Sequence, residues 1–226
     1  MTTTTLCIVG TLVLVWSSQA SPASPDQFEN TVTVSVYDRA HIQPKTLEQA
    51  ERIATRIFAA AGVNLQWRTR PISDETVLVQ DFSGTTESNC GVPLISNSVQ
   101  VQIRPHAPAG FAPQALAYSL PCADHGVQVT IYADRVEDVS NQTRAVFYRV
   151  WGYTLTHELG HVLLKSLTHE KSGLMKGVWS KGDWQRAALA IIPFTPDQAA
   201  HMREHLHRIK SYNAVLLTPD ARQSGF

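Results

Sequence analysis

The sequence predicts an α+β domain in which helices cover a mixed, twisted sheet. Short segments that alternate apolar and polar residues recur between residues 31 and 132. A segment with helical spacing of apolar residues separates the first two of them, and longer helical segments follow after residue 140. A strand, a helix and a strand in this order favour a crossover connection within one sheet. The last helix indicates a small C-terminal helical part, from about residue 180 to residue 226.

The first elements follow from their periodicity. Residues 31–37 alternate valines with Thr and Ser, which is typical of a half-buried strand. Residues 47–61 form a helix, and Gly62 provides the residue that commonly follows a helix end. A second strand is predicted at residues 63–69. Further strands are predicted at residues 77–81, 99–104, 115–120 and 127–132, with a surface loop rich in Pro, Ala and Gly at 105–113.

Two helices are predicted in the second half of the chain. Residues 140–165 form the longest one, with Ser140 or Asn141 available as its N-cap. Another helix spans residues 196–212, where Thr195 is the cap and Pro196 occupies the first helical position.

The first twenty residues have the layout of a secretory signal peptide. An apolar run at residues 6–16 precedes the small residues Ser18 and Ala20, which predicts cleavage after Ala20, with Ala23 as a second site. No Lys or Arg precedes the run, and the alternative is an N-terminal strand or a membrane anchor. We therefore expect a secreted or periplasmic protein without a stable membrane span once the signal is removed.

Composition and cysteine content agree with export of a single domain. The 226 residues include 19 basic and 19 acidic side chains, and no basic run is present, which argues against a nucleic-acid partner. After a flexible leader at residues 21–30, residues 31–226 fit one domain. Cys7 would be removed with the signal peptide, which leaves Cys90 and Cys122 as an even pair. This pair predicts a disulfide in an oxidising compartment; the alternative is two unrelated buried thiols.

The candidate chemistry lies on the long predicted helix, where His157, Glu158 and His161 form an H-E-x-x-H pattern. Residues four apart lie on one face of a helix, so both imidazoles can reach one ion. Zinc prefers neutral imidazole nitrogens in a tetrahedral site, and a catalytic site leaves one position for water. Glu158 lies beside the first ligand, where it can take a proton from that water. The alternative is a pair of structural histidines beside a surface Glu.

A catalytic zinc ion needs a third protein ligand, for which His169 is our prediction. On an unbroken helix His169 would lie about 12 Å beyond His161 along the axis, too far for one ion. The helix must therefore end near Lys165, and the chain must turn back. The alternative third ligands are Glu170, Glu204 and His205.

Residues 156–179, THELGHVLLKSLTHEKSGLMKGVW, resemble the metzincin-like zincins. They are most similar to a group of small secreted bacterial proteins in which H-E-x-G-H precedes a third His, a Gly-apolar-Met turn and a Trp. Residues 127–137 resemble the strand and acidic turn that lead into the active-site helix of that group. The resemblance, which is dense over residues 115–180, implies a zincin-like fold and one zinc ion per chain. It also implies a ligand set of His157, His161 and His169, a general base at Glu158, and Met175 in a turn beneath the metal.

The sequence departs from the family pattern at several positions. The common metzincin motif has Gly where Leu164 stands and His where Leu167 stands. Members of the bacterial group usually end the helix in Gly, where this chain has Lys165. The Tyr that follows the Met-turn in some metzincins is absent. Candidates for stabilising a transition state are Tyr153, Tyr212, His205 and His207. The alternative is that these side chains only pack or lie on a solvated helix face. A solvated helix face also explains the pair His201 and His205, which are four residues apart.

The resemblance implies a zinc metallopeptidase that acts on peptide or protein substrates, and we expect it to be a monomer. In zincins an edge strand above the cleft binds an extended peptide, and the strand at 127–132 or its neighbour at 115–120 is the predicted edge. Two alternatives remain. One is a catalytically inactive zinc-binding recognition module, and the other is a zinc hydrolase that acts on an amide other than a peptide.

Overall fold

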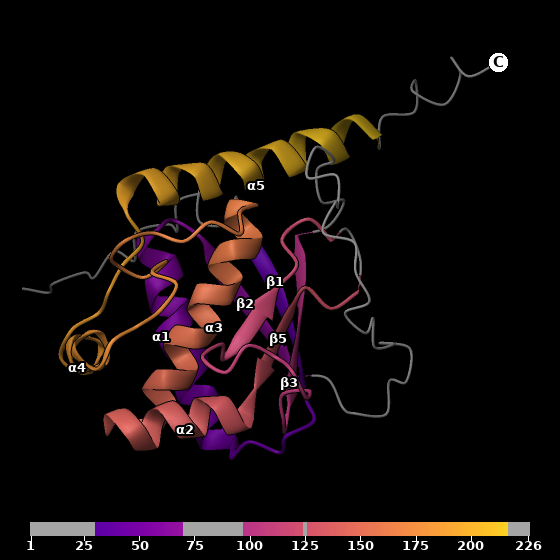
Figure 1. Cartoon of the computed structure of the whole chain (residues 1–226). Coiled ribbons are helices and arrows are strands. Elements are labelled where there is room, and N and C mark those ends of the chain that lie inside the picture. The colour runs from indigo at the N-terminus through magenta and orange to yellow at the C-terminus, as the bar shows by residue number, and fades with distance from the viewer. Residues whose placement is uncertain (1–29, 70–96, 124–125, 217–226) are drawn as a thin grey trace, which may run out of the picture.

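The computed structural model describes residues 30–69, 97–123 and 126–216, and it is an α+β fold with one mixed sheet (Figure 1). The strands are β1 (Thr31–Asp38), β2 (Asn64–Thr69), β3 (Ser98–Arg104), β4 (Ala117–Ser119) and β5 (Val129–Tyr132). The helices are α1 (Pro44–Ala60), α2 (Ala133–Thr143), α3 (Phe147–Leu164), α4 (Lys181–Leu189) and α5 (Pro196–Leu216). The predicted signal peptide, the leader up to residue 29, the strand at 77–81 and Cys90 lie outside the described residues, so the Cys90–Cys122 disulfide stays a prediction.

The sheet has the strand order β2-β1-β3-β5-β4. The pairs β1–β2, β1–β3 and β3–β5 are parallel, whereas β4 is antiparallel to β5. Parallel strands need buried faces, and Val32, Val34 and Val36 of β1 are accordingly buried. Among the described strands β2 and β4 are at the two edges, so of the two predicted edge segments the one at 115–120 provides an edge and the one at 127–132 lies one strand inside.

Helices α1 and α3 lie side by side against one face of the sheet, and α5 crosses over their ends (Figure 1). α1 begins at Pro44, three residues earlier than predicted, because Pro fits the first helical position and has no N–H to leave unpaired. The two helices approach closely at Gly152, where an added Cβ would lie 2.9 Å from Ile53 side-chain atoms.

The prediction of one helix over residues 140–165 is wrong, because α2 and α3 are separate. Arg144 adopts a left-handed conformation with φ 56° and ends α2. The Ser140 hydroxyl donates to the Ala145 carbonyl at 2.7 Å, and the Thr143 hydroxyl accepts from the Ala145 N–H at 3.3 Å. These side chains satisfy backbone groups at the break, so Ser140 belongs to the end of α2 and does not cap the helix that carries the motif.

The C-terminal part contains α4, which the sequence analysis did not delimit, and α5. α4 begins with a capping box in which Ser180 and Asp183 bond each other's backbone N–H. At α5 the predicted cap is confirmed: the Thr195 hydroxyl accepts from the Gln198 N–H at 3.2 Å, and the Gln198 side chain accepts from the Thr195 N–H at 3.0 Å. Within the described part of the chain, none of the helices has the length and apolar character needed to cross a bilayer.

Candidate metal centre

The three predicted histidine ligands converge on one point. His157 and His161 lie one turn apart on α3, and their Nε2 atoms are 3.0 Å apart. The Nε2 atom of His169, from the loop after α3, is 3.2 Å from that of His161. A ligand atom from each residue lies within 4.8 Å of the others. Glu170, Glu204 and His205 are not members of this cluster.

The turn that brings His169 back is built at the end of α3. Lys165 adopts φ 52° and ψ 39°, the left-handed conformation in which helices commonly end. The Lys165 N–H bonds the Val162 carbonyl at 3.3 Å, and the Ser166 N–H bonds the His161 carbonyl at 3.2 Å. These two bonds form a Schellman motif, so the helix ends where the geometry of His169 requires.

Backbone carbonyls fix the orientation of the two helical imidazoles. His157 Nδ1 lies 2.9 Å from the Leu174 carbonyl, and His161 Nδ1 lies 2.7 Å from the Ser166 carbonyl. A carbonyl only accepts, so each Nδ1 carries a hydrogen and each Nε2 of the neutral ring presents a lone pair. Burial, with a contribution from the neighbouring histidines, lowers the pKa of His157 to about 4, and burial also lowers the pKa of His161. Both rings are therefore neutral at neutral pH.

This donor set fits a zinc ion. Two lone pairs that face each other at 3.0 Å with no hydrogen between them repel, and a cation between them removes the repulsion. Tetrahedral zinc with Zn–N bonds of about 2.0–2.1 Å places its ligand nitrogens about 3.3–3.4 Å apart. The Nε2 atom of His161 lies at similar distances, 3.0 and 3.2 Å, from those of His157 and His169. Gly177 allows the following loop to approach His169, because an added Cβ would lie 2.8 Å from the His169 ring.

Glu158 lies beside this cluster on α3 and is buried, with 8% of its surface exposed. Burial raises the pKa of its carboxyl group to about 7, although a hydrogen bond from Ser119 acts in the opposite direction. Ser119, on β4, bonds Glu158 Oε2 and also lies 3.1 Å from the Glu158 main-chain oxygen. The candidate base is thus held between α3 and the edge strand.

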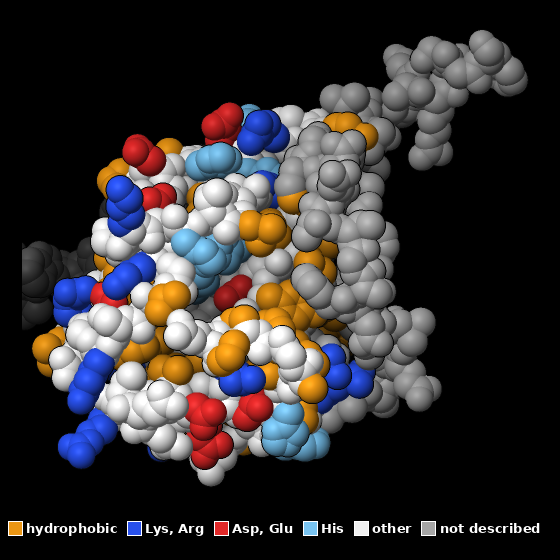
Figure 2. Space-filling view, viewed as in Figure 1, with side chains coloured by type: hydrophobic (Ala, Val, Ile, Leu, Met, Phe, Trp, Pro, Cys, Tyr) orange, Lys and Arg blue, Asp and Glu red, His pale blue; other side chains and the backbone are white. Residues whose placement is uncertain are grey.

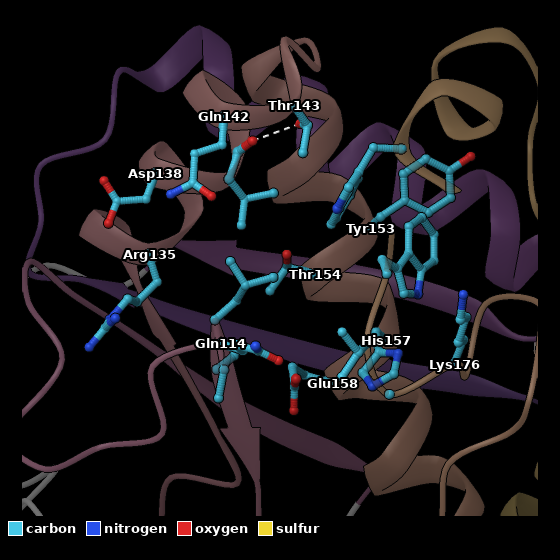
Figure 3. Close-up of a pocket in the computed structure, with 18 of the residues that line it drawn as sticks. Gln114, Arg135, Asp138, Gln142, Thr143, Tyr153, Thr154, His157, Glu158 and Lys176 are labelled. Carbon is cyan, nitrogen blue, oxygen red and sulfur yellow. Dashed lines mark hydrogen bonds between the residues drawn. The ribbon is translucent and has the colours of Figure 1, made fainter. Parts of the chain in front are cut away.

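A pocket of about 510 Å³ opens next to His157, Glu158 and His169. Figure 2 shows histidine side chains at the border of a hollow, with hydrophobic side chains along part of its rim. In Figure 3, His157 and Glu158 lie at one end of the pocket, and Gln142 and Thr143 of α2 lie at the other. The opposite walls are residues 113–117, which lead into β4, and residues 176–179, which follow Met175.

Part of the pocket wall is aromatic. The rings of Tyr153 and Trp179 have centroids 5.2 Å apart, and those of Trp179 and Trp184 are 4.6 Å apart. All three side chains line the pocket. An apolar substrate group can therefore be buried next to the candidate metal centre.

Met175 packs against α3, and its place beneath a metal ion stays a prediction. It is 2% exposed, and an added Cβ at Gly160 would lie 2.8 Å from its sulfur atom. The residue before it, Leu174, supplies the carbonyl that orients His157. The loop is closed by a bond from the Glu170 N–H to the Met175 carbonyl at 2.8 Å. Met175 therefore packs under the histidine-bearing helix while its loop fixes the first histidine.

The other candidates for transition-state chemistry have different positions. The Tyr153 hydroxyl donates to the Ala190 carbonyl at 3.0 Å and accepts from the Ile192 N–H at 3.2 Å, so it fixes the segment between α4 and α5. His205 is buried on α5, and burial, with nearby positive charges, lowers its pKa to about 4. His201, His207 and Tyr212 are exposed on α5.

Sequence reasoning did not identify Ser119, Trp184 or Asp183. Ser119 meets Glu158 only through the fold, 39 residues away, and no local pattern marks it. Asp183 anchors the wall after Met175, because its carboxylate bonds Lys176 Nζ at 2.6 Å and the Ser180 N–H at 2.7 Å. The spacing of Ser180 and Asp183, typical of a capping box, was a usable signal for this helix start.

No family model matches the sequence, and no curated protein matches it. Among 28 matching chains of solved structures is the archaemetzincin of Methanopyrus kandleri, with 13% identity and a TM-score of 0.48. The match covers 78% of this chain and 96% of the archaemetzincin chain. At this level of similarity, the chemistry of the site must follow from its own residues. The resemblance to small secreted bacterial zincins stays a prediction.

Proposed function

We propose that this chain is a zinc-dependent peptidase that acts outside the cytoplasm. The observation that carries the proposal is the convergence of three imidazole Nε2 atoms, with two rings oriented by backbone carbonyls, beside a buried glutamate that lines a pocket. His157, His161 and His169 would hold one zinc ion, which when bound supplies a Lewis acid and lowers the pKa of water.

The protein's own residues would divide the remaining work. Glu158 takes a proton from the water that attacks the scissile carbonyl and delivers it to the leaving amine. Its burial favours this role, because a pKa of about 7 allows the carboxyl group both to accept and to donate a proton near neutral pH. The pocket can receive a substrate side chain next to His157.

The edge strand supplies a binding surface for an extended peptide. The Leu120 N–H bonds the Gln128 carbonyl, and the Tyr132 N–H bonds the Leu116 carbonyl, which fixes the phase of the β4–β5 ladder. Antiparallel strands direct alternate residues toward the partner, so the main-chain groups of Ala117 and Ser119 point away from β5. A substrate strand can pair there, a few ångströms from Glu158, which favours peptides over compact amides.

The sequence supports the proposed cellular location. The signal-peptide layout of residues 1–20 supports secretion or release into the periplasm, and the balanced charge supports a protein without a nucleic-acid partner. We propose a monomer that meets peptide or protein substrates. Fractionation of an expressing cell with N-terminal sequencing of the exported chain tests cleavage after Ala20.

Glu158→Gln tests the proposed mechanism. Gln has nearly the same shape but cannot take the proton, so we expect kcat for cleavage of a quenched-fluorescence peptide library to fall by roughly 10²- to 10⁴-fold. Metal analysis should still find one zinc ion per chain, because the imidazoles are unchanged. Equal activity of the two proteins would contradict the role of Glu158.

The two alternatives predict different outcomes of the same assay. An inactive recognition module would bind zinc and cleave no peptide at all. A zinc hydrolase with another substrate would not cleave the peptide library but would cleave simple acylated amines, and Glu158→Gln would abolish that cleavage. The pocket beside Glu158 and the position of β4 at one end of the described sheet support the peptidase.

A further inference from the structure

Ser119 has two separate relations to the candidate active site. Its main chain belongs to β4, which ends the sheet among the described residues, whereas its side chain is buried against α3. The Ser119 hydroxyl lies within hydrogen-bonding distance of two oxygens of Glu158, the main-chain carbonyl oxygen at 3.1 Å and the carboxylate Oε2.

A serine hydroxyl has one hydrogen, so it donates to one of these oxygens at a time. Hydrogen bonds to an ionised carboxylate are the stronger ones, so the hydroxyl donates to Oε2 when Glu158 is charged. Among the described residues, none donates a hydrogen bond to Oε1, and Glu158 lines the pocket. The contact therefore makes the two carboxylate oxygens unequal.

We infer that Ser119 is a positioning residue for Glu158, which holds Oε2 in place and leaves Oε1 directed to the pocket as the oxygen that takes the proton. This inference rests on the proposed function. A glutamate side chain has three rotatable bonds, and a hydrogen bond to its far end limits the rotamers that move the carboxylate away.

The same residue connects the base to the substrate-binding edge. The main-chain N–H and carbonyl of Ser119 point away from β5, where an extended substrate would pair, while its hydroxyl points to Glu158. A substrate that pairs with β4 therefore restrains the strand whose Ser119 hydroxyl holds the Glu158 carboxylate in place. The effect of Ser119 should appear in kcat more than in KM, because the main-chain groups remain when the hydroxyl is removed.

Ser119→Ala in the full zinc-loaded chain tests the inference. We expect kcat to fall by roughly 10- to 100-fold, with KM within about twofold and with zinc content and unfolding midpoint unchanged. Ser119→Thr keeps the hydroxyl and should recover most of kcat. Ser35→Ala is the matched control, because Ser35 is a buried strand serine on β1 and should leave activity unchanged.

A second measurement does not depend on peptide cleavage. Acetohydroxamic acid binds a metal ion and passes its proton to a neighbouring carboxylate, so its Kd for the cobalt-substituted protein reports the placement of Glu158. We expect Ser119→Ala to weaken this binding roughly tenfold, and the same substitution in a Glu158→Asp background to add little.

These outcomes separate the inference from the proposed function. Wild-type protein that binds the hydroxamate in a Ser119-dependent manner but cleaves no peptide would overturn the peptidase proposal and support the positioning role. Active wild-type protein with an equally active Ser119→Ala variant, or equal hydroxamate binding by both, would overturn the positioning role. Loss of zinc or of the folded state in Ser119→Ala, but not in Ser35→Ala, would also overturn it, because Ser119 would then support the fold.

Discussion

The loop between α3 and α4 connects two polar clusters that differ in how their groups are satisfied. At one end, His157 and His161 direct acceptor nitrogens at each other, and His169 Nε2 lies 3.2 Å from that of His161. At the other end, Asp183 accepts hydrogen bonds from Lys176 and Ser180 and pairs with Arg186. The facing lone pairs of His157 and His161 have no counter-charge among the described residues, whereas the aspartate cluster contains its own cations.

The difference separates a site for a ligand from a structural contact. Burying polar groups is costly unless each finds a partner, so two facing acceptor nitrogens on the buried side of the cluster, those of His157 and His161, favour a bound cation. The Asp183 cluster fixes the pocket wall that follows Met175. The Asp183 carboxylate finds its hydrogen-bond and charge partners within the chain, so it needs no bound ion. Metal removal should therefore affect the histidine cluster, whereas substitution in the Asp183 cluster should lower stability even when no metal is present.

The largest effect is expected at the histidine cluster. His161→Ala removes one of the three proposed zinc ligands, so zinc affinity and peptide cleavage should fall on the order of 10³-fold or more. Excess chelator should lower the unfolding midpoint of the wild type, because the zinc ion binds only the folded state, and it should leave the midpoint of His161→Ala unchanged. Metal analysis and thermal unfolding with and without chelator measure both.

The control for that experiment is His201→Ala, which removes an exposed histidine of α5. It should bind one zinc ion and respond to chelator like the wild type. A wild-type midpoint that is insensitive to chelator would remove the distinction between the two clusters.

The next effect is expected at the aspartate cluster. Burial alone would raise the pKa of Asp183, but hydrogen bonds from Lys176 and Ser180 outweigh it and hold the pKa well below its usual range. Asp183→Asn should therefore lower the unfolding free energy of the metal-free protein by about 3 kcal/mol at pH 7. Urea unfolding of both proteins in chelator measures the difference.

The pH dependence of that difference has a definite sign. Because the folded-state pKa of Asp183 is depressed, its contribution is complete above the unfolded pKa of about 3.9 and is lost as pH falls below that value. The gap between wild type and Asp183→Asn should therefore shrink in acid. Glu137→Gln, at an exposed carboxyl of α2, is the control and should change stability little at either pH.

The sequence predicts an element correctly where a local pattern of side chains is enough to determine it. The alternation of valines in β1, the apolar stripe of α1 and the Thr195 cap of α5 are local signals, and each gave the right element. The convergence of His169 with the helical pair was also accessible, because helix geometry alone requires the chain to turn back after His161. Whether these histidines bind zinc stays a prediction.

The failures occur where tertiary contacts outweigh local signals. The break between α2 and α3 places Arg144 in a left-handed conformation, although neither Gly nor Pro marks the position. Ser140 and Thr143 compensate by bonding backbone groups at the break, and that role is indistinguishable in sequence from an N-cap. The contact between Ser119 and Glu158 depends on the packing of β4 against α3, which no spacing encodes.

Helix geometry predicts that the chain turns back near Lys165, although the residue type does not mark the left-handed conformation found there. Substitutions at Lys165 are expected to have the smallest effect of those proposed here. The turn at Lys165 directs the Ser166 carbonyl to His161 and the chain back toward His169, yet a left-handed residue with a Cβ is strained. Lys165→Gly and Lys165→Ala both lose the bond from Lys165 Nζ to the Pro121 carbonyl, so their comparison isolates the effect of backbone conformation.

Lys165→Gly should be more stable than Lys165→Ala by about 1 kcal/mol in urea unfolding, because only glycine adopts this conformation without cost. Zinc affinity should follow the same order, since the strained turn also places two of the three imidazoles. Equal stability of the two variants would mean that the helix end relaxes without the left-handed turn, and the histidine cluster would then depend on the Met175 loop instead.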